Sequence, residues 1–250
     1  MTMNTREKTI KAINFFEDLM SKIGVPTMPA SLRNLFFEDW LLQAVGDSDA
    51  EAVNWMLEHK AVSESAVNRA LRESIVTCWK RETEEDKDEF EAAKEIFYAL
   101  LDSGADPCYS DNSYEPPVHT AAMYGVNFAL QEFINICGKD KLDRLCDSEG
   151  IGIITLAACD NNLVGTYILL RALRGEAAWE RDNSRQLPEE YAACDEFKEM
   201  VKLLEDYGAY ADGHPEIVRE ADNIKEHCRG RKDLEARHRA NDGMEENKER

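Results

Sequence analysis

The sequence has few basic residues and no long apolar run. It contains 50 Asp and Glu against 30 Lys and Arg, a formal net charge of −20, and this balance opposes binding to nucleic-acid phosphates or to an anionic membrane. No window approaches the roughly 18 consecutive apolar residues of a membrane span, and the N-terminus lacks the basic-then-apolar pattern of a secretory signal. We therefore expect a cytoplasmic protein, in the host cytoplasm if it is a bacterial effector or a viral protein, that binds neither membrane nor nucleic acid directly.

The sequence also lacks paired cysteines and catalytic motifs. Its seven cysteines are scattered without a CxxC pair, which fits reduced thiols better than a disulfide framework or a zinc site. The phosphate-binding, zinc-protease and serine-hydrolase motifs GxGxxG, GxxxxGK[ST], HExxH and GxSxG do not occur. The prediction is a noncatalytic protein with no catalytic residues, no cofactor and no metal.

Negative charge is concentrated in the body of the chain. Residues 216–250 carry ten acidic and nine basic side chains, so nearly all the excess charge lies in residues 1–215. The densest run, residues 81–91 (RETEEDKDEFE), repels itself and cannot lie in a core. It is expected to be a solvated loop or a helix extension, and two functional interpretations stay open: a solvated face of an insertion, or a docking element for a basic partner.

An internal repeat runs through the second half of the sequence. Residues 111–125, 147–161 and 182–196 align without a gap, because each segment starts with Asp and carries Ala-Ala ten positions later. The spacing of about 35 residues is typical of repeat architectures. Two earlier units fit less closely, one near residues 41–61 and one split by the acidic run. The pattern therefore predicts about five units.

Local chemistry indicates where the helices of a unit begin and end. The small Ala-Ala pairs allow helices of neighbouring units to approach closely. Pro117 and Pro188 suit the first helical turn, where a missing N–H costs nothing. Gly104 and Gly208 suit the left-handed position that ends a helix.

The segments Pro-Pro-Val-His-Thr-Ala-Ala at 116–122 and Leu-Leu-Asp-Ser-Gly-Ala-Asp at 100–106 resemble the ankyrin repeat. The resemblance covers roughly residues 34–211. It implies an all-α fold: an α-solenoid of ankyrin-like β-turn/helix-turn-helix repeats with N- and C-terminal capping helices. It also implies that the His119 imidazole links neighbouring fingers, the loops that precede each first helix, by hydrogen bonds.

These patterns divide the chain into four parts. Residues 1–33 are expected to hold an N-terminal capping helix, and residues 34–214 the repeat domain with an acidic insertion at 80–91. A C-terminal capping helix is expected at 215–228. The alternating charges of residues 229–250 predict a disordered tail.

The resemblance implies a protein-interaction module, an adaptor, inhibitor or effector that binds a protein with a basic surface through finger tips and a concave face. The alternative is an acidic nucleic-acid mimic that blocks a DNA- or RNA-binding protein. The sequence leaves the partner and the oligomeric state open. The expected partner-binding positions are Tyr109, Asn112, Ser113, Tyr114, Glu115, Met123, Tyr124, Ser148, Glu149, Ile151 and Asp160.

Overall fold

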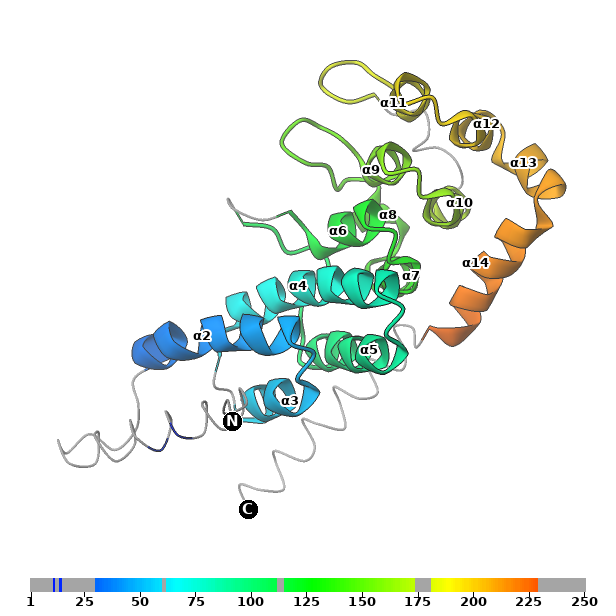
Figure 1. The fold of residues 1–250 in the computed structure, drawn as a ribbon. Helices are drawn as coiled ribbons and strands as arrows, with labels where there is room; N and C mark the ends of the chain where they lie inside the picture. Colours follow the sequence, from blue (N-terminus) through cyan, green and yellow to red (C-terminus); the bar gives the residue numbers. More distant parts are fainter. Residues whose placement is uncertain are drawn as a thin grey trace. The chain divides into compact units, whose positions relative to one another are not determined.

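A computed structural model describes residues 30–59, 62–111, 115–173 and 181–228, together with Lys11 and Asn14. Within these ranges the chain forms thirteen helices and no strand, with an isolated antiparallel bridge between Cys146 and Gly152 (Figure 1). The expected all-α class is therefore confirmed. No helix of the described part is both long and apolar enough to cross a bilayer.

The chain divides into two compact units, residues 1–106 and 107–250. The repeat domain expected over 34–214 spans this boundary, so the two units are described separately. Most of the expected N-terminal capping region and the charged tail at 229–250 lie outside the described residues.

Unit 1 contains two helix pairs. They are α2 (Ala30–Gly46) with α3 (Ala50–Glu58), and α4 (Glu64–Thr83) with α5 (Lys87–Asp102). Helix α2 packs beside α4, and α3 packs beside α5. Phe37, Leu41, Leu71, Ile96 and Phe97 are almost fully buried between them, so this unit has a continuous apolar core.

The acidic run lies in helix extensions and not in an inserted loop. Residues 81–83 end α4, a short turn follows, and residues 87–91 begin α5. Asp86 caps α5, because its carboxylate accepts a hydrogen bond from the N–H of Glu89 at 3.2 Å. The apolar face of α5 begins at Ala93, so the charged first turn remains in solvent.

Unit 2 contains three helix pairs followed by two further helices. The pairs are α6 (Pro117–Met123) with α7 (Asn127–Cys137), α9 (Ile153–Cys159) with α10 (Leu163–Ala172), and α11 (Pro188–Cys194) with α12 (Lys198–Glu205). The short α8 (Lys139–Leu142) follows α7. Pro117 and Pro188 stand at the first positions of α6 and α11, as predicted.

The first helices of these pairs form one row and the second helices another. Helix α9 packs between α6 and α11, and α10 packs against both α7 and α12. The Ala-Ala pairs at 121–122 and 157–158 are fully buried in the first row. Ala193 is exposed; it lies on α11, the last helix of the row in the described residues.

The chain continues through α13 (Tyr207–Gly213) into α14 (Pro215–His227). Helix α14 occupies the range expected for the C-terminal capping helix, and it packs against α10 and α7. The prediction that Gly208 ends a helix is wrong, because Gly208 lies inside α13. Helix α12 already ends at Glu205, and the carboxylate of Asp206 caps α13 by accepting from the N–H of Ala209 at 3.0 Å.

All five helix pairs share one type of turn. Each turn contains a residue with φ between 53° and 69°, and the N–H of the next residue bonds to the carbonyl five residues back. This pattern closes a helix by satisfying its last carbonyls. The left-handed residues are Ser48, Glu85, Gly125, Asn161 and Glu196.

Candidate functional site

Two hairpin-like loops, the fingers, precede α9 and α11 in unit 2. The first spans residues 147–151 and the second residues 182–186, and Figure 1 shows both loops extending from the same end of the first-row helices. In the first, the N–H of Asp147 donates to the carbonyl of Ile151 at 3.1 Å. In the second, the N–H of Asp182 donates to the carbonyl of Gln186 at 3.2 Å.

An aspartate carboxylate organises each finger from within. Oδ1 of Asp147 accepts hydrogen bonds from the N–H groups of Glu149 and Ile151, both at 2.8 Å. Oδ1 of Asp182 accepts from the N–H of Gln186 at 2.9 Å. This use of a short acidic side chain in a turn explains the Asp that begins the second and third sequence repeats.

The two fingers are joined to each other. The N–H of Asn183 donates to the carbonyl of Glu149 at 3.1 Å. At Gly150, which has φ of +78°, an added Cβ would lie 2.8 Å from Oδ1 of Asn183. Glycine suits this backbone conformation, and it also allows the close approach of the second finger.

A tyrosine supports the second finger. The hydroxyl of Tyr191 donates a short hydrogen bond to Oδ2 of Asp182. This bond raises the pKa of Tyr191 to about 12, and it lowers the pKa of Asp182 below its ordinary value, with help from the N–H of Gln186. The pair therefore keeps a protonated phenol against an ionised carboxylate across the neutral pH range.

Asn162 links the first two helix pairs of unit 2. Its side-chain amide donates to the carbonyl of Ala122 at 3.2 Å and to Oδ1 of Asn127 at 3.0 Å, while its Oδ1 caps α10 through the N–H of Gly165 at 2.9 Å. Every polar atom of this amide side chain is thus used. Together with the finger bond, this link fixes the register of successive pairs.

The predicted partner-binding residues fall into three groups. Glu115, Ser148, Glu149 and Asp160 are exposed, whereas Tyr109, Met123, Tyr124 and Ile151 are half-buried. Asn112, Ser113 and Tyr114 lie outside the described residues. The described positions occupy finger segments and the ends of first-row helices.

Four exposed acidic residues, one from the first finger and three from the ends of α9 and α11, make up what we call the acidic strip: Glu149, Asp160, Asp195 and Glu196. Helices α9 and α11 pack together, and the charges of both Asp160 and Asp195 raise the pKa of Cys159. The charge of Glu149 likewise raises the pKa of Tyr191. Arg185 adds a basic side chain at the tip of the second finger.

The partner-binding positions expected from the sequence do not include Asp195 or Glu196. The signal was present, since Asp195 occupies in the third repeat the position that Asp160 occupies in the second. Asp195 and Asp160 follow Cys194 and Cys159, the last residues of their first-row helices.

Burial shifts the pKa values of Cys159 and His119 in opposite directions. Burial raises the pKa of Cys159, and the Asp160 and Asp195 charges raise it further, so this thiol is a weaker nucleophile at neutral pH. Burial lowers the pKa of His119, although the backbone of Leu145 and the charge of Asp147 oppose that shift.

The expected role of His119 in linking fingers stays a prediction. Its side chain is fully buried, but neither ring nitrogen makes a well-formed hydrogen bond. The backbone of Leu145, just before the finger at 147–151, still raises the pKa of His119, so a link from His119 to that finger stays a prediction.

A small cavity lies beside the fingers. Its volume is about 130 Å³, and Leu142, Arg144, Ile154, Thr155 and Arg181 contribute to its lining. Pockets that bind cofactors or drug-sized ligands usually measure some 300–1,000 Å³. In the described ranges, no three His, Cys, Asp or Glu side chains are grouped to hold a metal ion.

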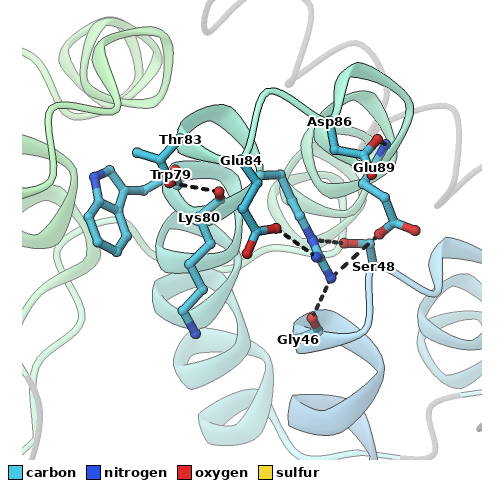
Figure 2. Close-up of polar contacts among 9 residues, drawn as sticks. Gly46, Ser48, Trp79, Lys80, Thr83, Glu84, Asp86 and Glu89 are labelled. Atoms are coloured by element: carbon cyan, nitrogen blue, oxygen red, sulfur yellow. Dashed lines mark hydrogen bonds and ion pairs between the residues drawn. The ribbon is translucent and has the colours of Figure 1, made fainter.

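In unit 1, Arg81 begins the acidic run and makes several polar contacts. The Arg81 guanidinium donates to the carbonyl of Gly46 and to Oγ of Ser48, each at 3.3 Å, and pairs with Glu84 at 3.1 Å and Glu89 at 3.5 Å. Figure 2 shows these groups converging from the α2–α3 turn and the α4–α5 turn. Arg81 therefore ties two neighbouring turns together.

The rest of the acidic run is solvated. The exposed acidic residues are Glu82, Glu84, Glu85, Asp86 and Asp88. Shortly before the run, Trp79 is the large apolar side chain that is exposed among the described residues, with an exposed fraction of 37%. The arrangement fits the helix-extension interpretation; the docking interpretation stays a prediction.

Comparison with known proteins found no match: no family model, curated protein or solved structure is significantly similar to this chain.

Proposed function

We propose that this chain is a noncatalytic protein-binding module built from ankyrin-type helix pairs, two in unit 1 and three in unit 2. The observation that carries the proposal is the pair of fingers, which have the same internal hydrogen bonds and are joined by the bond from Asn183 to Glu149. Repeated helix pairs with such loops present a series of surface positions on a rigid support.

The helices that support the fingers and the surface positions that the fingers carry differ in chemistry. The helices beneath the fingers are held by buried Ala-Ala pairs and by the Asn162 link. The finger segments and the neighbouring helix ends carry exposed polar side chains such as Ser148, Glu149 and Asp160. Substitutions at these exposed positions change the surface without changing the fold, as a binding scaffold requires.

The proposed partner is a protein with a basic surface. The acidic strip draws Glu149, Asp160, Asp195 and Glu196 from one finger and two helix ends, and the whole chain carries a net charge of −20. Complementary charge speeds association and selects against acidic partners. Half-buried Met123 and Tyr124 at the end of α6 offer apolar contact area beside it.

The test is affinity capture by the purified full-length chain at low and high salt, with partners identified by mass spectrometry. A D160N/D195N variant removes two charges of the acidic strip. A D212N/E226Q variant removes two exposed charges from α13 and α14 and serves as the matched control. We expect a basic protein retained by the wild type and the control, with roughly tenfold less bound to the strip variant.

The alternative function, nucleic-acid mimicry, gives a different result. Captured proteins would then be DNA- or RNA-binding proteins, and duplex DNA would compete for them. Capture would fall steeply with salt, and the strip and control variants would lose binding equally, since total charge and not the strip would carry it.

A further inference from the structure

Two cysteines of unit 2 lie together although they are far apart in the sequence. Sγ of Cys108 is 3.2 Å from Sγ of Cys137, across a sequence separation of 29 residues. Both residues are half-buried, so neither is enclosed in the core as Cys78 is. A sequence without a CxxC pair gives no sign of this juxtaposition.

Both cysteines stand on anchored backbone. Cys108 follows Pro107, whose carbonyl accepts a hydrogen bond from the N–H of Val118 in the first turn of α6 at 3.0 Å. Cys137 is the last residue of α7, and the N–H of Gly138 closes that helix on the carbonyl of Ile134 at 3.0 Å. The two thiols are therefore held near each other by a turn bonded to α6 on one side and by the end of α7 on the other.

The other five thiols have different surroundings. Cys78 is buried, and burial raises its pKa to about 12. Cys159 lies beside the acidic strip, while Cys146 and Cys194 are exposed. The thiol of Cys228 donates to the carbonyl of Phe128 at 3.5 Å. Cys108 and Cys137 are the two whose sulfur atoms contact each other.

We propose that Cys108 and Cys137 form a dithiol modification site that small-molecule disulfides such as oxidised glutathione convert to an intramolecular disulfide. The proposal does not depend on the protein-binding function. Its basis is the contact between the sulfur atoms of two half-buried cysteines, which makes the second step intramolecular and hence fast.

The reaction balances with oxidised glutathione as the oxidant. The thiolate of one cysteine attacks a sulfur of oxidised glutathione, the glutathione S–S bond breaks, and one glutathione thiolate leaves. The second cysteine thiolate then attacks the protein sulfur of the mixed disulfide and releases the second glutathione. Each protein thiol loses its proton to solvent, each glutathione thiolate gains one, and two electrons pass from the protein to the oxidant.

The experiment incubates the full-length chain with oxidised or reduced glutathione, quenches in acid, alkylates the remaining thiols and maps peptides by mass spectrometry. After oxidation we expect roughly tenfold less alkylation at Cys108 and Cys137 and a peptide that links them. Cys146 and Cys194 serve as internal controls; they should remain alkylated or carry glutathione, without a link to each other.

Single serine variants test the second step. In C108S, Cys137 should retain bound glutathione, because the thiol that would displace it is gone, and C137S should trap the adduct on Cys108. The proposal is overturned if wild-type Cys108 and Cys137 carry glutathione as extensively as Cys146 and no linked peptide appears. The wild-type result decides the matter even if a serine variant fails to fold.

Discussion

In each of the five helix pairs, one residue with a left-handed backbone conformation lies in the turn between the two helices. The side chains at these positions are varied. Gly125 and Asn161 are types that adopt such a conformation readily, whereas Ser48, Glu85 and Glu196 are not. Sequence patterns could identify the first two as turn residues. The other three are held in place by the bond to the carbonyl five residues back, a feature visible only in the folded chain.

Adding one methyl group at Gly165 should destabilise the folded protein. A Cβ there would lie 2.2 Å from Nδ2 of Asn162 and 2.7 Å from Oδ1 of Asn127, so G165A should disrupt the Asn162 link. We expect a loss of about 1–3 kcal/mol in the free energy of unfolding, measured in urea.

The matched control is G213A, at the end of α13, where an added Cβ meets no atom within 4 Å. Its stability should stay within about 0.5 kcal/mol of the wild type. Equal effects of the two substitutions would show that the Asn162 link does not limit this position.

Buried His119 should give the protein an acid-sensitive component of stability. Because burial lowers the pKa of His119 below 6.5, the unfolded chain binds a proton at a higher pH than the folded chain does. Stability is then complete above pH 6.5 and falls as the pH drops through that value toward the folded pKa.

The H119Q variant should lack this component. Urea unfolding at several pH values is expected to show a wild-type curve that falls more steeply with acid than that of H119Q. The H59Q variant, which alters the exposed His59, should follow the wild type. Parallel curves for wild type and H119Q would contradict the expectation.

At the scale of the elements, the helix starts were the most predictable feature. Pro117 and Pro188 begin α6 and α11, because proline suits a first helical turn whatever surrounds it. The prediction that a helix ends at Gly208 is wrong, because Asp206, two residues earlier, caps the start of a new helix. Glycine permits a left-handed end, but competing caps decide where the helix stops.

Of the candidate site, sequence reasoning found the fingers and the ends of the first-row helices. The repeat register locates these positions, since they recur with the Asp and the Ala-Ala pair. It could not find the contact between Cys108 and Cys137, or the bonds from Asn162 to Ala122 and Asn127. Such contacts depend on how the elements pack.

Arg81 should stabilise unit 1 by joining two turns. In R81A, the bonds to the carbonyl of Gly46 and to Ser48 are lost together with the ion pairs to Glu84 and Glu89. Because the guanidinium is partly exposed, we expect a loss of about 1 kcal/mol, seen as a lower Tm in thermal unfolding.

Lys80 offers the comparison, since it is the neighbouring exposed base on the same helix. K80A removes the same charge without the bonds to the α2–α3 turn. If both variants lower the Tm equally, the effect comes from net charge and the bridging role of Arg81 is refuted.

The whole molecule carries a net charge of −20, so its folded state should be weakened by self-repulsion at low ionic strength. Sodium chloride screens this repulsion, and the Debye length falls from about 30 Å at 0.01 M to about 10 Å at 0.1 M. We expect the Tm to rise over this range in circular dichroism melts. A constant or falling Tm would mean that local ion pairs outweigh the general repulsion.

The exposed Ala193 marks a place where the row of first helices stops. Ala122 and Ala158 are covered in α6 and α9, whereas the same position in α11 faces solvent. Helix α11 therefore has less protection against local opening, and its backbone amides should exchange with deuterium faster than those of α9. Fraying from this end would release the second finger first and leave the inner helix pairs intact.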